Sequence, residues 1–276
     1  MSSTRTADLD HAFPSWLLPQ WQAPARVHAV STLRHGGVSR GPWGLADGSV
    51  GGWNLGAHCS DDAADVEENR LLLRERLPAE PLWLEQVHGT DVLDADGLVP
   101  ADGGGLGVRA PALPARADAA VTTRRGVVLA VLTADCLPVA LANARGTAIG
   151  IAHAGWRGLA AGVLENTVAA LQRASPGEHL IAWLGPAIGP SRFEVGEEVL
   201  AAFVDSDPGA QAAFTPTGTP GKWRADLFAL ARRRLVRAGV RDIAGGGLCT
   251  ASDPQRFYSF RRDRVTGRMA SLVWLA

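Results

Sequence analysis

The apolar residues of this chain follow two kinds of spacing, which predict a mixture of short buried strands and amphipathic helices. Short unbroken apolar runs favour strands, whereas apolar residues three or four positions apart favour one face of a helix. The helical spacing predicts helices at about 61–77, 159–174, 193–203 and 225–239. The runs predict an edge strand at 27–32 and further strands at 82–88, 92–93, 119–123, 126–142, 147–152, 180–184, 245–250, 257–260 and 269–275. Strands and helices mix without strict alternation and without an internal repeat. We therefore expect an α/β fold, with a mixed sheet or two packed sheets covered by helices.

The stretch at 151–158 joins a buried strand to a long helix and carries a histidine between them. The apolar run at 147–152 ends just before His153, and the helical spacing follows. A side chain at such a junction is exposed, and the N–H groups of the first helical turn point into the same space, where they favour an anion. Gly155 and Gly158 allow the backbone to approach a ligand closely. The pattern predicts a functional site rather than a piece of core.

Another polar interruption lies in the most apolar run of the chain. Asp135 and Cys136 break the strand predicted at 126–142. A carboxylate in such surroundings must be paired or hydrogen-bonded, because burying an unpaired charge is costly. The residues at 143–146 turn the chain back into the next strand, as in a β-hairpin. This hairpin would bring Cys136 and His153 to the same end of a sheet.

Three segments lack the periodicity of strands and helices. Residues 1–25 are expected to form a loosely ordered N-terminal arm, which leaves 26–276 as the folded domain. Residues 96–116 are almost wholly Gly, Ala, Pro, Leu and Asp, and we expect a mobile surface insertion there. The glycine-rich basic stretch at 34–42 fits a plain turn or a loop that contacts an anion, and we favour the turn.

Composition and charge narrow the class of partner. The chain has 276 residues, 27 basic and 28 acidic, so nothing favours nucleic acid or an anionic membrane. Cys59, Cys136 and Cys249 are odd in number and widely spaced, which argues against a disulfide framework and for a reducing compartment. The sequence shows no secretory leader pattern and no apolar run of membrane-spanning length. We therefore expect a cytoplasmic protein, with its oligomeric state left open.

Two histidines and a cysteine share the position of a strand end or a strand break. His88 and His153 each end a predicted strand near a glycine, and Cys136 lies at the break. Zinc accepts two imidazoles and a thiolate, and three protein ligands with a vacant fourth position are typical of a catalytic zinc. By spacing alone we favour the plainer interpretation, in which the cysteine is a small buried hydrophobe and the histidines are merely exposed.

Several strings of residues together resemble the laccase-domain family. They are Gln86-Val-His-Gly89, Thr133-Ala-Asp-Cys-Leu-Pro-Val139 and His153-Ala-Gly-Trp-Arg-Gly158, with further matches at 54–58, 184–190, 193–196 and 257–263. The resemblance covers roughly residues 30 to 276, and the motifs are specific in combination. Bacterial members of the family were labelled multicopper polyphenol oxidases and are now mostly described as purine nucleoside phosphorylases.

This resemblance implies a single α/β domain of two mixed sheets packed together and covered by helices, a four-layer α/β/β/α sandwich similar to cysteine-hydrolase-like toxins. It implies zinc, with copper as the alternative metal, bound by His88, Cys136 and His153. It also implies phosphorolysis of adenosine, inosine and guanosine to the base and ribose-1-phosphate. Adenosine deamination and methylthioadenosine cleavage are the implied side reactions, so purine nucleosides and phosphate are the expected partners. The chain departs from the family pattern by loss of a threonine at 32–37 and by the long stretch at 96–116.

Four further residues take roles under this interpretation. Phosphorolysis needs an anion held beside the anomeric carbon, and the donor fork of a guanidinium suits phosphate. Arg34 and Arg157 are the predicted phosphate contacts, and Asn54 is a predicted substrate contact. Asp135 joins the predicted catalytic group, where we expect it to orient a ligating imidazole rather than to act as an acid–base group.

Other classes of function use the same residues differently. A copper laccase would need paired His-x-His motifs and a soft axial ligand, which seven unpaired histidines and two methionines do not supply, so we reject it as the main chemistry. A metal-free Cys136–His153 hydrolase or amidase, acting for instance on cell-wall peptides, is the alternative function. A structural zinc would need a fourth protein ligand, such as His58 or Cys59.

Overall fold

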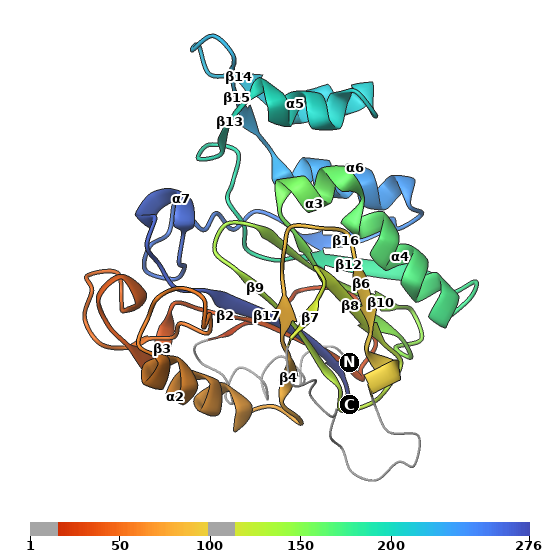
Figure 1. The fold of residues 1–276 in the computed structure, drawn as a ribbon. Helices are drawn as coiled ribbons and strands as arrows, with labels where there is room; N and C mark the ends of the chain where they lie inside the picture. The colour runs from red at the N-terminus through yellow and green to blue at the C-terminus, as the bar shows by residue number, and fades with distance from the viewer. Residues whose placement is uncertain (1–15, 99–113) are drawn as a thin grey trace.

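The computed structural model describes residues 16–98 and 114–276, which form two main sheets (Figure 1). The five-stranded sheet has the order β1 (Trp16–Leu17), β2 (Val27–Thr32), β17 (Met269–Leu275), β9 (Val128–Thr133) and β4 (Pro81–Leu82). The six-stranded sheet has the order β16 (Asp242–Gly245), β12 (Leu180–Leu184), β10 (Leu137–Asn143), β11 (Ile149–Ala154), β8 (Ala119–Thr122) and β6 (Val92–Asp94). The pairs β4–β9, β12–β16 and β6–β8 are parallel and their neighbours antiparallel, so both sheets are mixed.

The two sheets pack face to face through branched apolar side chains. Val131 and Val273 come from the five-stranded sheet, and Ile149, Ile151 and Ile181 from the six-stranded one. Branched side chains pack well on a pleated surface, and the alternation of a strand sends every second residue to the opposite face. The predicted α/β class, with two mixed sheets packed together, is confirmed.

Helices cover the outer faces of these sheets (Figure 1). On the six-stranded sheet, Leu141 shares one buried cluster with Leu171 and Leu230 of the covering helices. On the five-stranded sheet, Leu272 shares a buried cluster with Leu73. The helices concerned are α3 (Trp156–Ala161), α4 (Val163–Ala174) and α6 (Leu227–Arg237) on the first sheet, and α2 (Ala63–Arg74) on the second.

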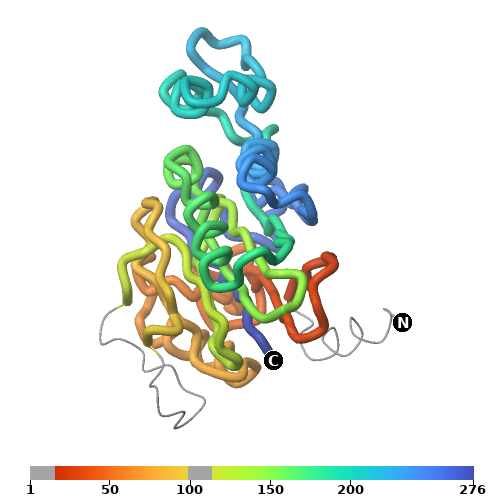
Figure 2. Tube along the Cα trace, turned by 90° about the vertical axis from the view of Figure 1, so that its right-hand side faces the viewer, coloured from red at the N-terminus to blue at the C-terminus, as the bar shows by residue number. Residues whose placement is uncertain are grey.

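A smaller lobe projects beyond these helices, at the top of Figures 1 and 2. Phe203 and Phe214 pack inside it with their ring centroids 6.1 Å apart. Both belong to the same buried cluster as α4 and α6, so the lobe is continuous with the main core. It consists of α5 (Glu197–Val204), the 3-10 helix η3 (Pro208–Ala213), and a three-stranded antiparallel sheet of β13 (Glu194–Gly196), β15 (Lys222–Ala225) and β14 (Phe214–Pro216).

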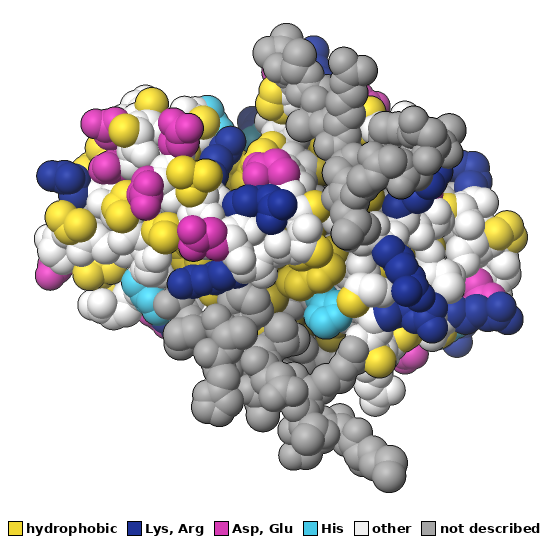
Figure 3. Space-filling model, turned by 90° about the horizontal axis from the view of Figure 1, so that it is seen from below, with side chains coloured by type: hydrophobic (Ala, Val, Ile, Leu, Met, Phe, Trp, Pro, Cys, Tyr) yellow, Lys and Arg dark blue, Asp and Glu magenta, His cyan; other side chains and the backbone are white. Residues whose placement is uncertain are grey.

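Short elements complete the described chain. They are β3 (His35–Ser39), η1 (Gly41–Trp43), β5 (Leu84–Glu85), η2 (Ala95–Leu98), β7 (Ala115–Arg116) and α7 (Phe260–Asp263). In the part of the chain that the structure describes, no helix combines the length and the apolar character needed to cross a membrane. On the face seen from below, acidic and basic side chains are interspersed with hydrophobic ones (Figure 3).

Several predicted elements differ from the structure. The apolar run at 126–142 is not one interrupted strand, because β9 and β10 belong to different sheets. The helix predicted at 159–174 begins at Trp156 and breaks at Gly162, whose φ of 104° ends α3. The stretch at 34–42 is more than a turn, since it contains β3.

Three strand predictions were also wrong in detail. Residues 27–32 do not lie at an edge, since β2 pairs with both β1 and β17. Residues 257–260 lead into α7 instead of forming a strand, and most of 245–250 is loop.

The predicted arm and insertion fall partly outside the described residues, which exclude 1–15 and 99–113. Trp16 begins β1 and is 6% exposed, so this end of the arm is attached to the sheet. The last two residues of the predicted insertion form β7, which pairs with β5 and so leads the chain back toward the segment that precedes His88.

Candidate metal centre

Three side chains with metal-binding atoms converge from separate parts of the chain. The ligand atoms of His88, Cys136 and His153 all lie within 4.8 Å of one another. Cys136 Sγ is 3.7 Å from His88 Nε2, and the two imidazole rings are 4.8 Å apart at 73°. The structure thus brings together the three residues that the sequence analysis named, and we refer to them as the triad.

The backbone explains why the triad meets. His153 pairs with Pro138 across the β10–β11 hairpin, and Cys136 lies two residues before that pair. The predicted proximity of Cys136 and His153 is therefore confirmed, although His153 lies inside β11 and not beyond its end. His88 follows β5 with a φ of 59°, a left-handed conformation that is uncommon outside glycine.

Asp118 holds two members of the triad in place. Its Oδ1 atom lies 2.7 Å from Nδ1 of His153. The same carboxylate accepts the backbone N–H groups of Val87, His88 and Gly89 at 3.1, 3.0 and 2.6 Å. Asp118 is completely buried. One carboxylate therefore orients the His153 ring and stabilises the turn that carries His88.

The charge of Asp118 decides how His153 is protonated. Burial opposes ionisation, but hydrogen bonds from His153 and from backbone N–H groups hold the pKa of Asp118 below its ordinary value. An ionised carboxylate only accepts hydrogen bonds, so Nδ1 of His153 donates to Asp118. Nε2 of His153 then faces the other two members of the triad. Sequence reasoning missed Asp118, although a carboxylate directly before the strand predicted at 119–123 was a usable signal.

The triad lines a cavity of about 570 Å³. His58, Glu85 and Arg268 contribute polar groups to its wall, and Phe260 contributes an aromatic ring that is 49% exposed. A pocket of this size and mixed lining suits a small organic molecule. The other lining residues are Leu84, Gln86, Leu132, Thr133 and Ala134.

Comparison with known proteins identifies the family. Residues 28–276 match the family described as multi-copper polyphenol oxidoreductase laccase. The chain belongs to this laccase family. A Pseudomonas aeruginosa relative named purine nucleoside phosphorylase is 51% identical, over 95% of this chain and 98% of its own length. An Escherichia coli relative with the same activity in its name is 49% identical, over 94% and 98%. A crystal structure of a Neisseria meningitidis protein has a TM-score of 0.83 and 43% identity, and covers 95% of this chain and 99% of that chain.

The donor set of this laccase-family site fits zinc. With ordinary zinc–sulfur and zinc–nitrogen bonds, a thiolate and an imidazole on a tetrahedral ion lie roughly 3.5 Å apart. The distance of 3.7 Å between Cys136 Sγ and His88 Nε2 is close to that value. Asp118 supports His153 as a carboxylate commonly supports a ligating imidazole. Among the described residues, His58 and Cys59 are not part of the ligand group, so neither supplies a fourth protein ligand.

The Cys136 thiol and the His153 imidazole shift each other's pKa. Burial raises the pKa of Cys136, but the nearby His153 and His88 outweigh burial and lower this pKa to about 6. Burial lowers the pKa of His153, but Cys136 and Asp118 outweigh it and raise this pKa to about 9. Near neutral pH Cys136 is therefore a thiolate, the form that binds metals and attacks electrophiles.

The two glycines of the strand–helix junction make room for the site itself. A Cβ on Gly155 would lie 2.9 Å from both Cys136 Sγ and His88 Cδ2. A Cβ on Gly158 would lie 2.7 Å from the carbonyl oxygen of Gly89. These distances are shorter than real Cβ atoms tolerate. The two glycines were predicted to let a ligand approach the backbone, but the groups that approach it are the protein's own.

Asp135 does not contact the imidazoles, contrary to its predicted orienting role. Its carboxylate accepts the Thr250 hydroxyl and the Arg261 backbone N–H, each at 2.6 Å. Its φ of 101° makes the sharp crossover between β9 and β10 that presents Cys136. Asp118 has the orienting role instead, and Asp135 fastens the crossover.

The predicted phosphate and substrate contacts lie outside the cavity wall. Arg34 is 5% exposed and donates to the carbonyl oxygens of Gly44 and Pro254. Arg157 is exposed, and its guanidinium lies 4.4 Å from the ring centroid of its neighbour Trp156. Asn54 is completely buried and bonds to backbone and carboxylate groups.

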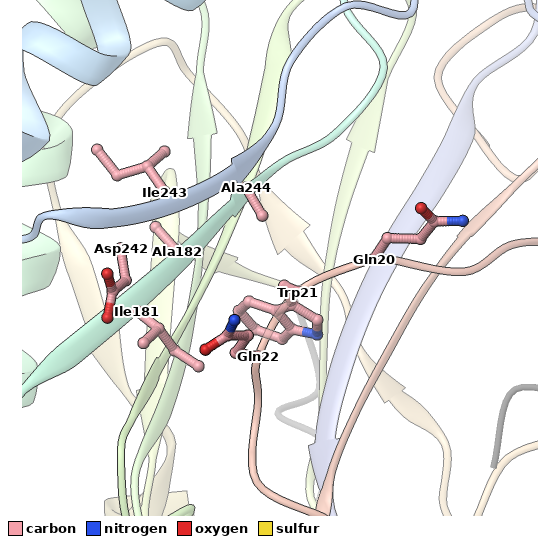
Figure 4. Close-up of a pocket in the computed structure, with 8 residues that line it drawn as sticks. All are labelled: Gln20, Trp21, Gln22, Ile181, Ala182, Asp242, Ile243 and Ala244. Atoms are coloured by element: carbon pink, nitrogen blue, oxygen red, sulfur yellow. The ribbon is translucent and has the colours of Figure 1, made fainter. Parts of the chain in front are cut away.

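A separate cavity of about 280 Å³ lies beside β12 and β16 (Figure 4). Asp242 is the one ionisable side chain among its described lining residues, and it pairs with His179 at 2.8 Å. The other lining residues are Gln20, Trp21, Gln22, Ile181, Ala182, Ile243 and Ala244. This cavity has no convergent set of nucleophilic or metal-binding groups, so we place the candidate site at the triad.

Proposed function

We propose that this chain is a zinc-dependent purine nucleoside phosphorylase that converts adenosine, inosine and guanosine to the base and ribose-1-phosphate. Adenosine deamination and methylthioadenosine cleavage are proposed as side reactions, and copper as the alternative metal. The observation that carries the proposal is the convergence of the triad on a cavity of about 570 Å³. The names of the Pseudomonas and Escherichia coli relatives support the reaction class.

The residues of the site suit such a reaction. Asp118 keeps Nδ1 of His153 protonated and leaves Nε2 for the metal. When bound, zinc would supply a Lewis acid with an open coordination position. Phe260 offers an exposed ring on which a purine can stack. The cavity walls hold the nucleoside near the triad, and such positioning is a large part of catalysis in group transfer.

One observation favours the Cys–His hydrolase as a second candidate. Cys136, His153 and Asp118 follow the order of nucleophile, base and orienting carboxylate. His88 has no role in a Cys–His hydrolase of this kind. His88 nevertheless adopts a left-handed φ of 59°, and its Nε2 atom lies 3.7 Å from Cys136 Sγ. The metal site uses all four residues, so we place it first.

The test measures ribose-1-phosphate release from adenosine across a phosphate titration, with zinc content determined for each protein. A phosphorylase should release ribose-1-phosphate in proportion to phosphate saturation, and His88→Ala and Cys136→Ser should both lose zinc and activity. A metal-free hydrolase should instead cleave its substrate without phosphate and keep most of its activity in His88→Ala. Free ribose at every phosphate concentration would remove the phosphorylase proposal.

The triad also bears on location. Cys136 must stay reduced to act as a ligand, and the three cysteines of the described chain are free. We propose a cytoplasmic location on this ground.

A further inference from the structure

Arg268 is the one guanidinium among the described residues that line the triad's cavity. It is partly buried, just before β17. Its Nη1 group donates to the carbonyl oxygens of Thr266 and Gly267, both at 3.0 Å. Among the described residues, Nε and Nη2 have no hydrogen-bond partner and no carboxylate pairs with the side chain. Arg268 therefore presents a positive charge and spare donors to the cavity.

The segment at 54–59 fixes the position of Arg268. The backbone N–H of Arg268 donates to Oδ1 of Asn54 at 2.8 Å, and its carbonyl oxygen accepts from Leu55 at 3.1 Å. A Cβ on Gly56 would lie 2.7 Å from Arg268 Cγ, so only glycine admits the side chain here. The Asn54 amide also donates to Asp61 at 2.9 Å. Asn54, predicted as a substrate contact, is a positioning residue for Arg268.

Among the described residues around the cavity, no carboxylate pairs with the Arg268 guanidinium and offsets its positive charge. Burial, together with Arg268 and Arg70, lowers the pKa of His58, so this imidazole is neutral near pH 7. Glu85 is the only carboxylate among the described lining residues, and it does not pair with Arg268. A partly buried cation without a carboxylate partner favours an anionic ligand.

We propose that Arg268 binds the phosphate co-substrate in the cavity that the triad lines. The inference rests on the proposed phosphorylase function and names the residue that recognises its anion. The donor fork of a guanidinium matches two phosphate oxygens, and an ammonium group does not reproduce this geometry. Arg268 takes the place of Arg34 and Arg157, neither of which lines the cavity.

The test compares wild type with Arg268→Gln and Arg268→Lys in the zinc-loaded full chain. Arg264→Gln is the matched control, because it removes an equal charge from an exposed side chain four residues away. Binding of inorganic phosphate is measured by calorimetry, and KM is determined for phosphate and adenosine separately. Zinc content and melting temperature are recorded for each protein.

Arg268→Gln should raise the dissociation constant and the KM for phosphate about tenfold to a hundredfold. The KM for adenosine and the zinc content should stay close to wild type, and Arg268→Lys should recover part of the phosphate affinity. An equal loss in Arg264→Gln would overturn the inference, because it would indicate general attraction of anions. Wild-type phosphate affinity in a folded Arg268→Gln or Arg268→Lys would overturn it as well.

The two proposals can fail separately. If wild type binds phosphate through Arg268 but makes no ribose-1-phosphate, Arg268 remains a phosphate-binding residue, and the phosphorylase function falls. If wild type is a phosphorylase and Arg268→Gln keeps its phosphate KM, only the inference falls. If wild type does not bind phosphate, both fall.

Discussion

At the scale of single residues, Asp118 connects two members of the triad, because it contacts the His153 ring and the turn that carries His88. A buried carboxylate normally costs stability unless its lone pairs are used. Here three backbone N–H groups and one imidazole share them, so the charge is compensated and two ligands are positioned together. A change at Asp118 should therefore disturb metal binding before it disturbs the rest of the fold.

We expect Asp118→Asn to weaken zinc binding about tenfold to a hundredfold, the usual effect of losing a group that orients a ligating imidazole. The amide cannot accept from Nδ1 of His153 and from three backbone donors with the strength of a carboxylate. Competition with a chromogenic chelator measures the affinity. Asp91→Asn, an exposed carboxyl near the same turn, is the control. Equal zinc affinity in Asp118→Asn and wild type would contradict this role.

Gly155 provides a second test at this scale. The added methyl group of Gly155→Ala would lie 2.9 Å from Cys136 Sγ and His88 Cδ2, so one ligand must move. We expect loss of stoichiometric zinc and of activity, with circular dichroism showing a folded protein. Gly247→Ala is the control, because a Cβ there meets nothing within 4 Å. Full zinc occupancy in Gly155→Ala would show that the junction is less tightly packed than its geometry indicates.

At the scale of elements, the sequence predicted what local patterns determine. The apolar runs gave β12 and β17 with their observed bounds, because these strands are buried on both faces along their whole length. The turn at 143–146 likewise predicted the hairpin that joins Cys136 to His153. These features depend on neighbouring residues and can be derived from them.

Other elements depend on contacts between distant residues, which no local pattern contains. The run at 126–142 has the same apolar character in β9 and β10, so nothing local shows that the two strands join different sheets. The assignment of the orienting role to Asp135 was wrong for the same reason. Each is a single carboxyl beside an apolar strand, and only the fold decides which one meets His153.

The contact between α6 and the projecting lobe gives a prediction at this scale. Arg233 and Arg237 of α6 both pair with the buried Asp207 of the lobe. Hydrogen bonds from Arg233, and then Arg237, hold the pKa of the Asp207 carboxyl well below its usual range. This ion pair ties the lobe to the helix layer.

A carboxyl with a lowered folded pKa contributes stability above its unfolded pKa of about 3.9, and this contribution is lost as the pH falls toward the folded value. We therefore expect Asp207→Asn to be less stable than wild type at pH 7, with the difference shrinking below about pH 4. Denaturant melts at several pH values measure it. The exposed Asp205→Asn is the control, and a difference that does not depend on pH would argue against the ion pair.

At the scale of the whole molecule, the three residues of the triad come from segments that connect the two main sheets. Cys136 lies where the chain leaves β9 of the five-stranded sheet for β10 of the six-stranded one. His153 belongs to β11 of the six-stranded sheet, and His88 follows β5, whose segment begins at β4 in the other sheet. A metal bound by all three would bridge segments that are far apart in the sequence, and so would favour the folded state.

Zinc should therefore raise the melting temperature of the whole domain. A ligand present at a hundred times its dissociation constant adds about 2.7 kcal/mol if it binds only the folded state. For a domain of this size, that corresponds to roughly 5–10 °C. The measurement is a thermal melt of chelator-treated protein with and without added zinc. Cys136→Ala removes one ligand and should abolish the zinc-dependent shift, whereas Cys249→Ala, outside the triad, should keep it. A shift of equal size in Cys136→Ala would place the stabilising zinc elsewhere on the chain.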